Sequence, residues 1–181
     1  MEKTIQSIDE FMASGEADEI IGLLEERYLK KIEQKRTIPA GFYKVLTQDL
    51  EDLLNAELQE AENEDTFGKY LKRVIKSKRL KYKEVYDPAM ITRQHFCRIV
   101  KGRDKERVCT PSKNTVYRIG LVLKLSLEEI HELLKTAGYT FKVGDRRDKL
   151  IIFCIKNKIY DFIEVEKYLE KHKVNSLFRD Y

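Results

Sequence analysis

Helical periodicity along most of the chain is the feature that most limits its fold. Apolar residues recur at alternating three- and four-residue steps, for example at Ala17, Ile21, Leu24 and Tyr28, which places them on one face of an α-helix. The apolar–polar alternation of a half-buried strand is confined to a brief stretch at 139–143. We therefore expect an all-α protein. The content of only eight glycines and three prolines in 181 residues agrees with that expectation.

Boundary signals divide this periodic pattern into separate helices. Pro39 and Pro88 end helices because proline cannot continue the hydrogen-bond ladder of the preceding turn. Ser7 and Glu10 have the spacing of a capping box, which predicts that the first helix begins there. Short polar residues that favour the position before a helix precede five later apolar stretches, at Thr92, Ser112, Ser126, Asp145 and Asp161.

The helices group into two parts, separated by a polar run that ends at residue 65. The periodic stretches at 16–36 and 42–58 predict two helices joined by a tight turn, which form an antiparallel hairpin within residues 1–65. Shorter helices follow in residues 66–181. We expect an acidic N-terminal helical hairpin and a second unit that ends in two additional helices.

Charge is distributed unevenly between these parts. Residues 1–65 hold 17 Asp and Glu against 7 Lys and Arg, whereas residues 66–118 hold 16 Lys and Arg against 4 Asp and Glu, a net charge of +12. Such a local excess of positive charge is typical of a surface that binds a polyanion. The alternative is a solvated basic surface that the acidic segment neutralises.

The stretch at 92–102 combines this positive charge with a helical pattern. Phe96, Ile99 and Val100 form its apolar side, and polar residues occupy its N-terminal end. An α-helix fits the major groove of B-DNA, where arginine pairs with guanine and glutamine with adenine through two hydrogen bonds each. The base-reading candidates are Arg93, Gln94, His95 and Arg98. The phosphate-binding candidates are Lys81, Lys83, Thr92, Lys101, Arg103, Lys105, Arg107 and Lys113.

Several positions between residues 66 and 138 match a known pattern: Leu80, Ile91, Thr92, Ile99, Gly102, then the stretches at 111–112 and 123–129. With these positions, the segment resembles the Cro/repressor-type (lambda-repressor-like) helix-turn-helix domain of five helices. It is also similar to a variant of that fold used as an attached module in bacterial multidomain proteins, which carries two further helices. The resemblance implies that the helix at 92–101 enters the major groove.

Three positions depart from the pattern of that family. Tyr82 stands where a glutamine usually helps to hold a phosphate, and Tyr86 replaces a small alanine that lets the second and third helices pack closely. Met90 occupies a glycine position that often has a positive φ, a costly state for methionine. These departures favour an alternative function, a protein-interaction module that keeps the fold without the DNA contacts.

Other classes of function lack the residues that they need. The three histidines have no cysteine or carboxylate at metal-ligand spacing, so we expect no metal and no cofactor. No phosphate loop, nucleophile elbow or paired-carboxylate motif indicates an enzyme. The chain has no apolar run of 18 residues and no secretory signal, and its three cysteines are an odd number without metal-like spacing. These features predict a cytoplasmic protein with no membrane contact.

The N-terminal segment predicts a further partner. Ile20, Ile21, Leu23 and Leu24 nearly encircle one helical turn, which is more apolar surface than a two-helix hairpin can bury. Repressor-type domains commonly bind DNA as dimers. We expect residues 1–60 to form a homodimer, with docking onto the basic residues or onto another protein as alternatives. The predicted function is that of a sequence-specific, double-stranded DNA-binding transcriptional regulator of the repressor or antitoxin kind.

Overall fold

The computed structural model describes residues 2–35, 66–104 and 107–179 of the chain. This part is all-α apart from a two-residue antiparallel ladder between β1 (Arg103–Asp104) and β2 (Arg107–Val108), so the all-α prediction is confirmed. None of the described helices is long and apolar enough to cross a membrane. In chain order the helices are α1 (Glu2–Ser14), α2 (Glu16–Lys35), α4 (Phe67–Ser77), α5 (Lys83–Tyr86), α6 (Arg93–Lys101), α7 (Lys113–Val122), α8 (Leu127–Thr136), α9 (Arg146–Lys156) and α10 (Phe162–Lys171).

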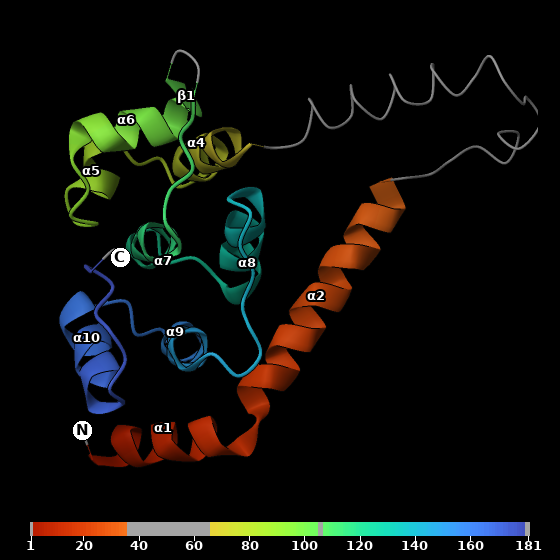
Figure 1. Cartoon of the computed structure of the whole chain (residues 1–181), viewed down its shortest axis with the longest axis vertical. Coiled ribbons are helices and arrows are strands. Elements are labelled where there is room, and N and C mark those ends of the chain that lie inside the picture. Colours follow the sequence, from red (N-terminus) through yellow and green to blue (C-terminus); the bar gives the residue numbers. More distant parts are fainter. Residues whose placement is uncertain (1, 36–65, 105–106, 180–181) are drawn as a thin grey trace, which may run out of the picture.

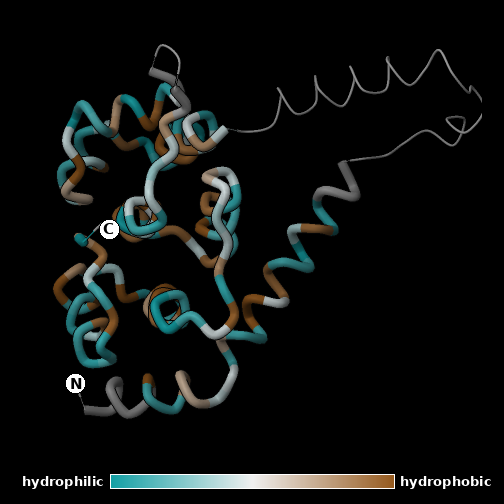
Figure 2. The backbone as a smooth tube through the Cα atoms, viewed as in Figure 1, coloured by the Kyte–Doolittle hydropathy of each residue, from teal (hydrophilic) through white to brown (hydrophobic). Residues whose placement is uncertain are grey.

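Two helices, α7 and α9, form the centre of the core. Figure 1 shows α5, α6 and β1 at one end of the molecule and α1 at the other, with α7 and α9 between them. The stretches 114–121 and 150–155 are buried throughout, because neighbouring helices surround both elements. Consecutive residues of both helices are buried, which is typical of helices without a solvent-facing side. Figure 2 shows the hydropathy of these residues along the backbone.

The predicted cap residues begin their helices. Backbone N–H groups in the first turn donate to the side chains of Thr92, Ser112, Ser126, Asp145 and Asp161. The Glu129 carboxylate accepts the second hydrogen bond of a capping box from the backbone N–H of Ser126. The predicted start of the first helix is wrong, since α1 begins at Glu2 and Ser7 lies inside it. No glycine or proline lies between residues 2 and 14, so nothing stops the helix from extending past Ser7.

The N-terminal helices pack against the C-terminal half of the chain. Ile8, Phe11, Ile21 and Leu24 belong to the same buried cluster as the residues of α8 and α9. The rings of Phe11 and Phe153 lie 5.4 Å apart between centroids. The second helix of the predicted hairpin, at 42–58, lies outside the described residues, and the division at residue 65 stays a prediction.

Ion pairs reinforce this packing. Lys171 binds Asp9 and Lys149 binds Asp18, both with N–O distances of 2.7 Å. These lysines hold the pKa of both aspartates below its ordinary value. Further pairs connect α2 with α8 and α9: Glu25 with Lys135, Glu16 with Lys156, Arg27 with Glu128, and Lys31 with Glu132. Asp9, Glu16, Asp18 and Glu25 are thus paired with cations of α8, α9 and α10.

His131 lies buried where α2 meets α8. Its ring stacks on Phe141 at 6.0 Å and meets the edge of Tyr28 at 5.8 Å. Within the described structure, neither ring nitrogen has a hydrogen-bond partner. Burial lowers the pKa of His131 below its ordinary value of 6.5, and the opposing charge of Glu25, 3.9 Å away, is the smaller influence.

This lowered pKa predicts a loss of stability in mild acid. A histidine that is harder to protonate in the folded state stabilises the fold above its unfolded pKa, and protonation below about pH 6.5 favours unfolding. We expect the free energy of unfolding to fall between pH 7 and pH 5, and His131→Phe to flatten that dependence. Burial also lowers the pKa of His172, so a residual slope should remain. Urea titrations across this pH range measure both slopes, and identical slopes would contradict the prediction.

Candidate nucleic-acid interface

The polar residues of α6 are separated from its apolar residues. The helix opens at Thr92, whose hydroxyl accepts a hydrogen bond from the backbone N–H of His95 at 3.2 Å. It ends at Gly102, which has a φ of 72°. Phe96 and Ile99 are fully buried. The alternation seen in the sequence therefore gives one side that is anchored in the core and one side that faces solvent.

The solvent-facing side of α6 carries the predicted base-reading residues. Arg93, Gln94 and Arg98 are exposed, whereas His95 is half-buried. The helix contains no acidic residue. In the described part of the chain, no carboxylate forms an ion pair with Arg93, Arg98 or Lys101. Such a face can donate hydrogen bonds to base edges and phosphate oxygens.

Two of the unusual residues pack against the buried side of this helix. Tyr82 and Tyr86 lie beside Phe96, with ring centroids 5.7 and 5.6 Å from it. Tyr86 is half-buried, and 42% of Tyr82 stays exposed. The ring of Tyr86 thus fills the contact between α5 and α6, where the resemblance implies a small alanine.

A buried arginine fixes the turn that precedes α6. The Arg118 guanidinium of α7 donates to the carbonyl oxygens of Ala89 and Met90, at 3.3 and 3.4 Å, and to the Thr115 hydroxyl at 3.1 Å. Met90 has a φ of 52°, which agrees with the expectation for its position. Its side chain is 69% exposed. Arg118 therefore stabilises a strained backbone next to the first turn of α6.

The predicted phosphate ligands before and within α6 lie at the surface. Lys81, Lys83, Thr92 and Lys101 are all exposed. Lys83 is 3.9 Å from the carboxylate of Asp87 in an exposed pair one helical turn apart, which leaves its ammonium available to an anion.

The remaining candidates are placed differently. The backbone of Arg103 and Arg107 forms the β1–β2 ladder directly after α6. Their side chains and the whole of Lys105 lie outside the described structure. Lys113 binds the buried carboxylate of Asp148 at 2.5 Å and retains only 20% exposure, so we leave it out of the proposed interface.

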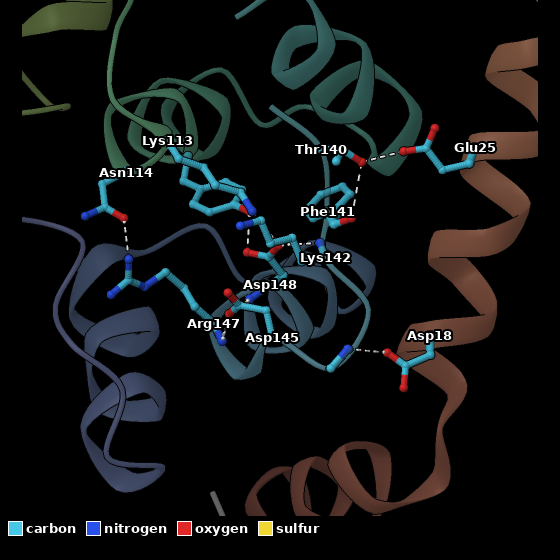
Figure 3. A network of polar contacts seen from close by, with 12 residues as sticks. Asp18, Glu25, Lys113, Asn114, Thr140, Phe141, Lys142, Asp145, Arg147 and Asp148 are labelled. Carbon is cyan, nitrogen blue, oxygen red and sulfur yellow. Dashed lines mark hydrogen bonds and ion pairs between the residues drawn. The ribbon is translucent and has the colours of Figure 1, made fainter. Parts of the chain in front are cut away.

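Lys113 belongs instead to a polar network between α7 and α9, shown in Figure 3. Asp148 is 1% exposed and also accepts hydrogen bonds from the Tyr117 hydroxyl and from the backbone N–H of Lys142, both at 2.7 Å. Burial raises the pKa of the Tyr117 hydroxyl well above its ordinary value, and the charge of Asp148 adds to this shift. The network is therefore a structural one that joins two central helices.

A second group of cations was missed in the sequence. Lys69, Lys72, Arg73 and Lys76 lie exposed on α4. Their spacing of three, one and three residues is the visible signal that places them on one face of a helix.

The described residues bring together no group of three or more side chains able to hold a metal ion.

In comparisons with known proteins, no protein-family model, no curated protein and no solved structure matches the chain. The case for a function therefore depends on the residues and geometry described above.

Proposed function

We propose that this chain is a cytoplasmic, sequence-specific double-stranded DNA-binding transcriptional regulator of the repressor or antitoxin kind. In this proposal α6 lies in the major groove, where Arg93, Gln94, His95 and Arg98 read base edges. Lys81, Lys83, Thr92 and Lys101 bind phosphates beside it, together with the loop at 103–107. The single observation that carries the proposal is the exposed, acid-free face of α6.

The arrangement of helices supports the same proposal. In this proposal α4 to α8 are the five helices of the repressor-like domain, and α9 and α10 are the two additional helices of its attached-module variant. The contacts of Tyr82 and Tyr86 with Phe96 offer a reason why larger residues are tolerated between the second and third of these helices.

The distribution of ion pairs argues against a merely neutralised basic surface. Four described acidic side chains of α1 and α2 bind cations of α8, α9 and α10. In the ranges 2–35 and 66–104, no ion pair connects these two helices with α4, α5 or α6. The described acidic side chains of α1 and α2 thus leave the exposed lysines of α4 and α6 available to a polyanion.

One observation favours the alternative of a protein-interaction module. Met90 and Tyr82 expose apolar surface next to the first turn of α6, and exposed apolar side chains are common where proteins bind each other. Selection from random DNA duplexes with purified protein separates the two functions, because only a sequence-specific reader enriches one motif.

Homodimerisation through residues 1–60 stays a proposal. Ile21 and Leu24 are buried against the same chain, while Leu23 and Leu29 are 50% and 58% exposed. A dimer would therefore use this outer side of α2 or the remainder of the segment. Light scattering on the full chain and on the chain without residues 1–60 measures the oligomeric state.

Base reading by α6 predicts different effects for two neighbouring cations. We expect Arg93→Ala to reduce the preference for the selected motif over random duplex by about 1–3 kcal/mol. The reason is that the substitution removes the two hydrogen bonds that the arginine donates to one base. Lys101→Ala, the matched control, should weaken both duplexes by the same factor, because phosphates carry no sequence information. Binding titrations on both duplexes measure the preference. An equal loss on both duplexes for Arg93→Ala would exclude α6 as the reader.

A further inference from the structure

We propose that the basic side of α4 is a second DNA contact, which binds the sugar–phosphate backbone beyond the groove that α6 reads. This inference rests on the proposed function. Lys69, Lys72, Arg73 and Lys76 are exposed along α4, while Leu71 and Ile75 on the opposite side are buried in the core. We call these four cations the α4 stripe.

The three lysines of the α4 stripe repel one another within the free protein. Like charges three and four residues apart destabilise a helix by about 0.2–0.5 kcal/mol per pair. The helix has no acidic residue to offset this repulsion. Over the described ranges, no carboxylate forms an ion pair with Lys69, Lys72 or Lys76. A bound polyanion relieves the repulsion, and this relief raises the affinity of the protein for the polyanion.

The position of the stripe relative to α6 is fixed by a close helix crossing. A Cβ atom added at Gly68 would lie 2.4 Å from the backbone oxygen of Val100, so the two backbones are in direct contact there. Figure 1 shows α4 beside α6 at the same end of the molecule. The stripe and the exposed face of α6 therefore belong to two helices in direct contact.

The length of the stripe fits a nucleic-acid strand. Lys69 and Lys76 are seven residues apart, or about 10 Å along the helix axis. Phosphates of one strand follow each other every 3.4 Å or so along the duplex axis, so this length spans about three of them. A membrane surface fits less well, because a helix that binds lipid inserts its apolar side, and the apolar side of α4 is already in the core.

Two charge-matched triple variants test the inference. The first carries Lys69→Gln, Lys72→Gln and Lys76→Gln on α4. The control variant removes the same charge elsewhere, with exposed lysines that follow α8 in the chain replaced: Lys142→Gln, Lys167→Gln and Lys173→Gln. Binding of each protein to a random-sequence duplex is measured between about 50 and 200 mM salt, and circular dichroism checks that each variant is folded.

We expect the α4 variant to flatten the plot of log affinity against log salt by about 2–3 units, or 0.9 or so for each lost phosphate contact. The control should keep the wild-type slope, and both variants should keep the wild-type ratio of selected to random affinity. Equal slopes in the two variants would overturn the inference while leaving the proposed function intact. An absence of duplex binding by the wild type would overturn both. Loss of binding to anionic lipid vesicles in the α4 variant, with its DNA slope unchanged, would assign the stripe to a membrane surface and also overturn it.

Discussion

Replacement of Asp148 by alanine should lower the free energy of unfolding by about 3–5 kcal/mol, the cost typical of removing one partner from a buried ion pair. The substitution leaves the fully buried Tyr117 hydroxyl and the Lys142 N–H without their acceptor, and it takes from Lys113 the carboxylate that balances its charge. Since this network joins α7 to α9, the loss should act on global unfolding. Urea denaturation at pH 7 measures it.

Asp161→Ala is a suitable control for this prediction. Asp161 is also an aspartate, but it is exposed, and within the described residues it accepts hydrogen bonds from the first turn of α10 alone, from Ile163 and Glu164. Loss of such a cap costs about 1 kcal/mol. If both variants lost the same stability, the buried network would contribute no more than an ordinary helix cap.

The second large effect is expected at Gly68. Gly68→Ala should lower the free energy of unfolding by about 3 kcal/mol, the upper end of the usual cost of overpacking. The new Cβ would lie 2.4 Å from the backbone oxygen and 3.0 Å from the carbonyl carbon of Val100, and a backbone cannot yield as a flexible side chain can. The variant should therefore push α4 and α6 apart and weaken DNA binding as well. Thermal and urea unfolding measure the first effect, and duplex titration measures the second.

Gly22→Ala is the same chemical change, but we expect it to raise the free energy of unfolding. Gly22 is in the interior of α2, and beyond its chain neighbours and the backbone of its own helix no atom of the described residues lies within 4 Å of a Cβ added there. Alanine restricts the unfolded chain and favours the helix, so this variant should gain about 0.5–1 kcal/mol. A Gly68→Ala protein that gained stability in the same way would show that the two helices do not meet closely.

Helix boundaries could be predicted from the sequence because a cap involves only residues two or three positions apart. Ser126 and Glu129 form both hydrogen bonds of their box for this reason. The helix start predicted at Ser7 was wrong because serine favours a cap position without requiring one, and the preceding residues also permit a helix. Local signals therefore determine where a helix can begin but do not exclude a longer one.

Contacts between distant segments could not be predicted in this way. The sequence places Lys113 in the basic segment, but the residue that binds it, Asp148, lies 35 positions later, and no local pattern connects them. The packing of Phe11 on Phe153 depends equally on tertiary structure. The exposed face of α6 could be predicted from periodicity alone, because Phe96 and Ile99 mark the side that is buried in the core.

The hydrogen bonds that Arg118 donates to the carbonyls of Ala89 and Met90 affect the binding free energy of any partner that contacts the first turn of α6. A loop that is ordered only on contact loses conformational entropy at that moment, which weakens the complex. Here the loss has already occurred during folding, because the guanidinium extends from α7, which is buried along most of its length. The turn before α6 is therefore preorganised, and a partner finds its shape in place on arrival.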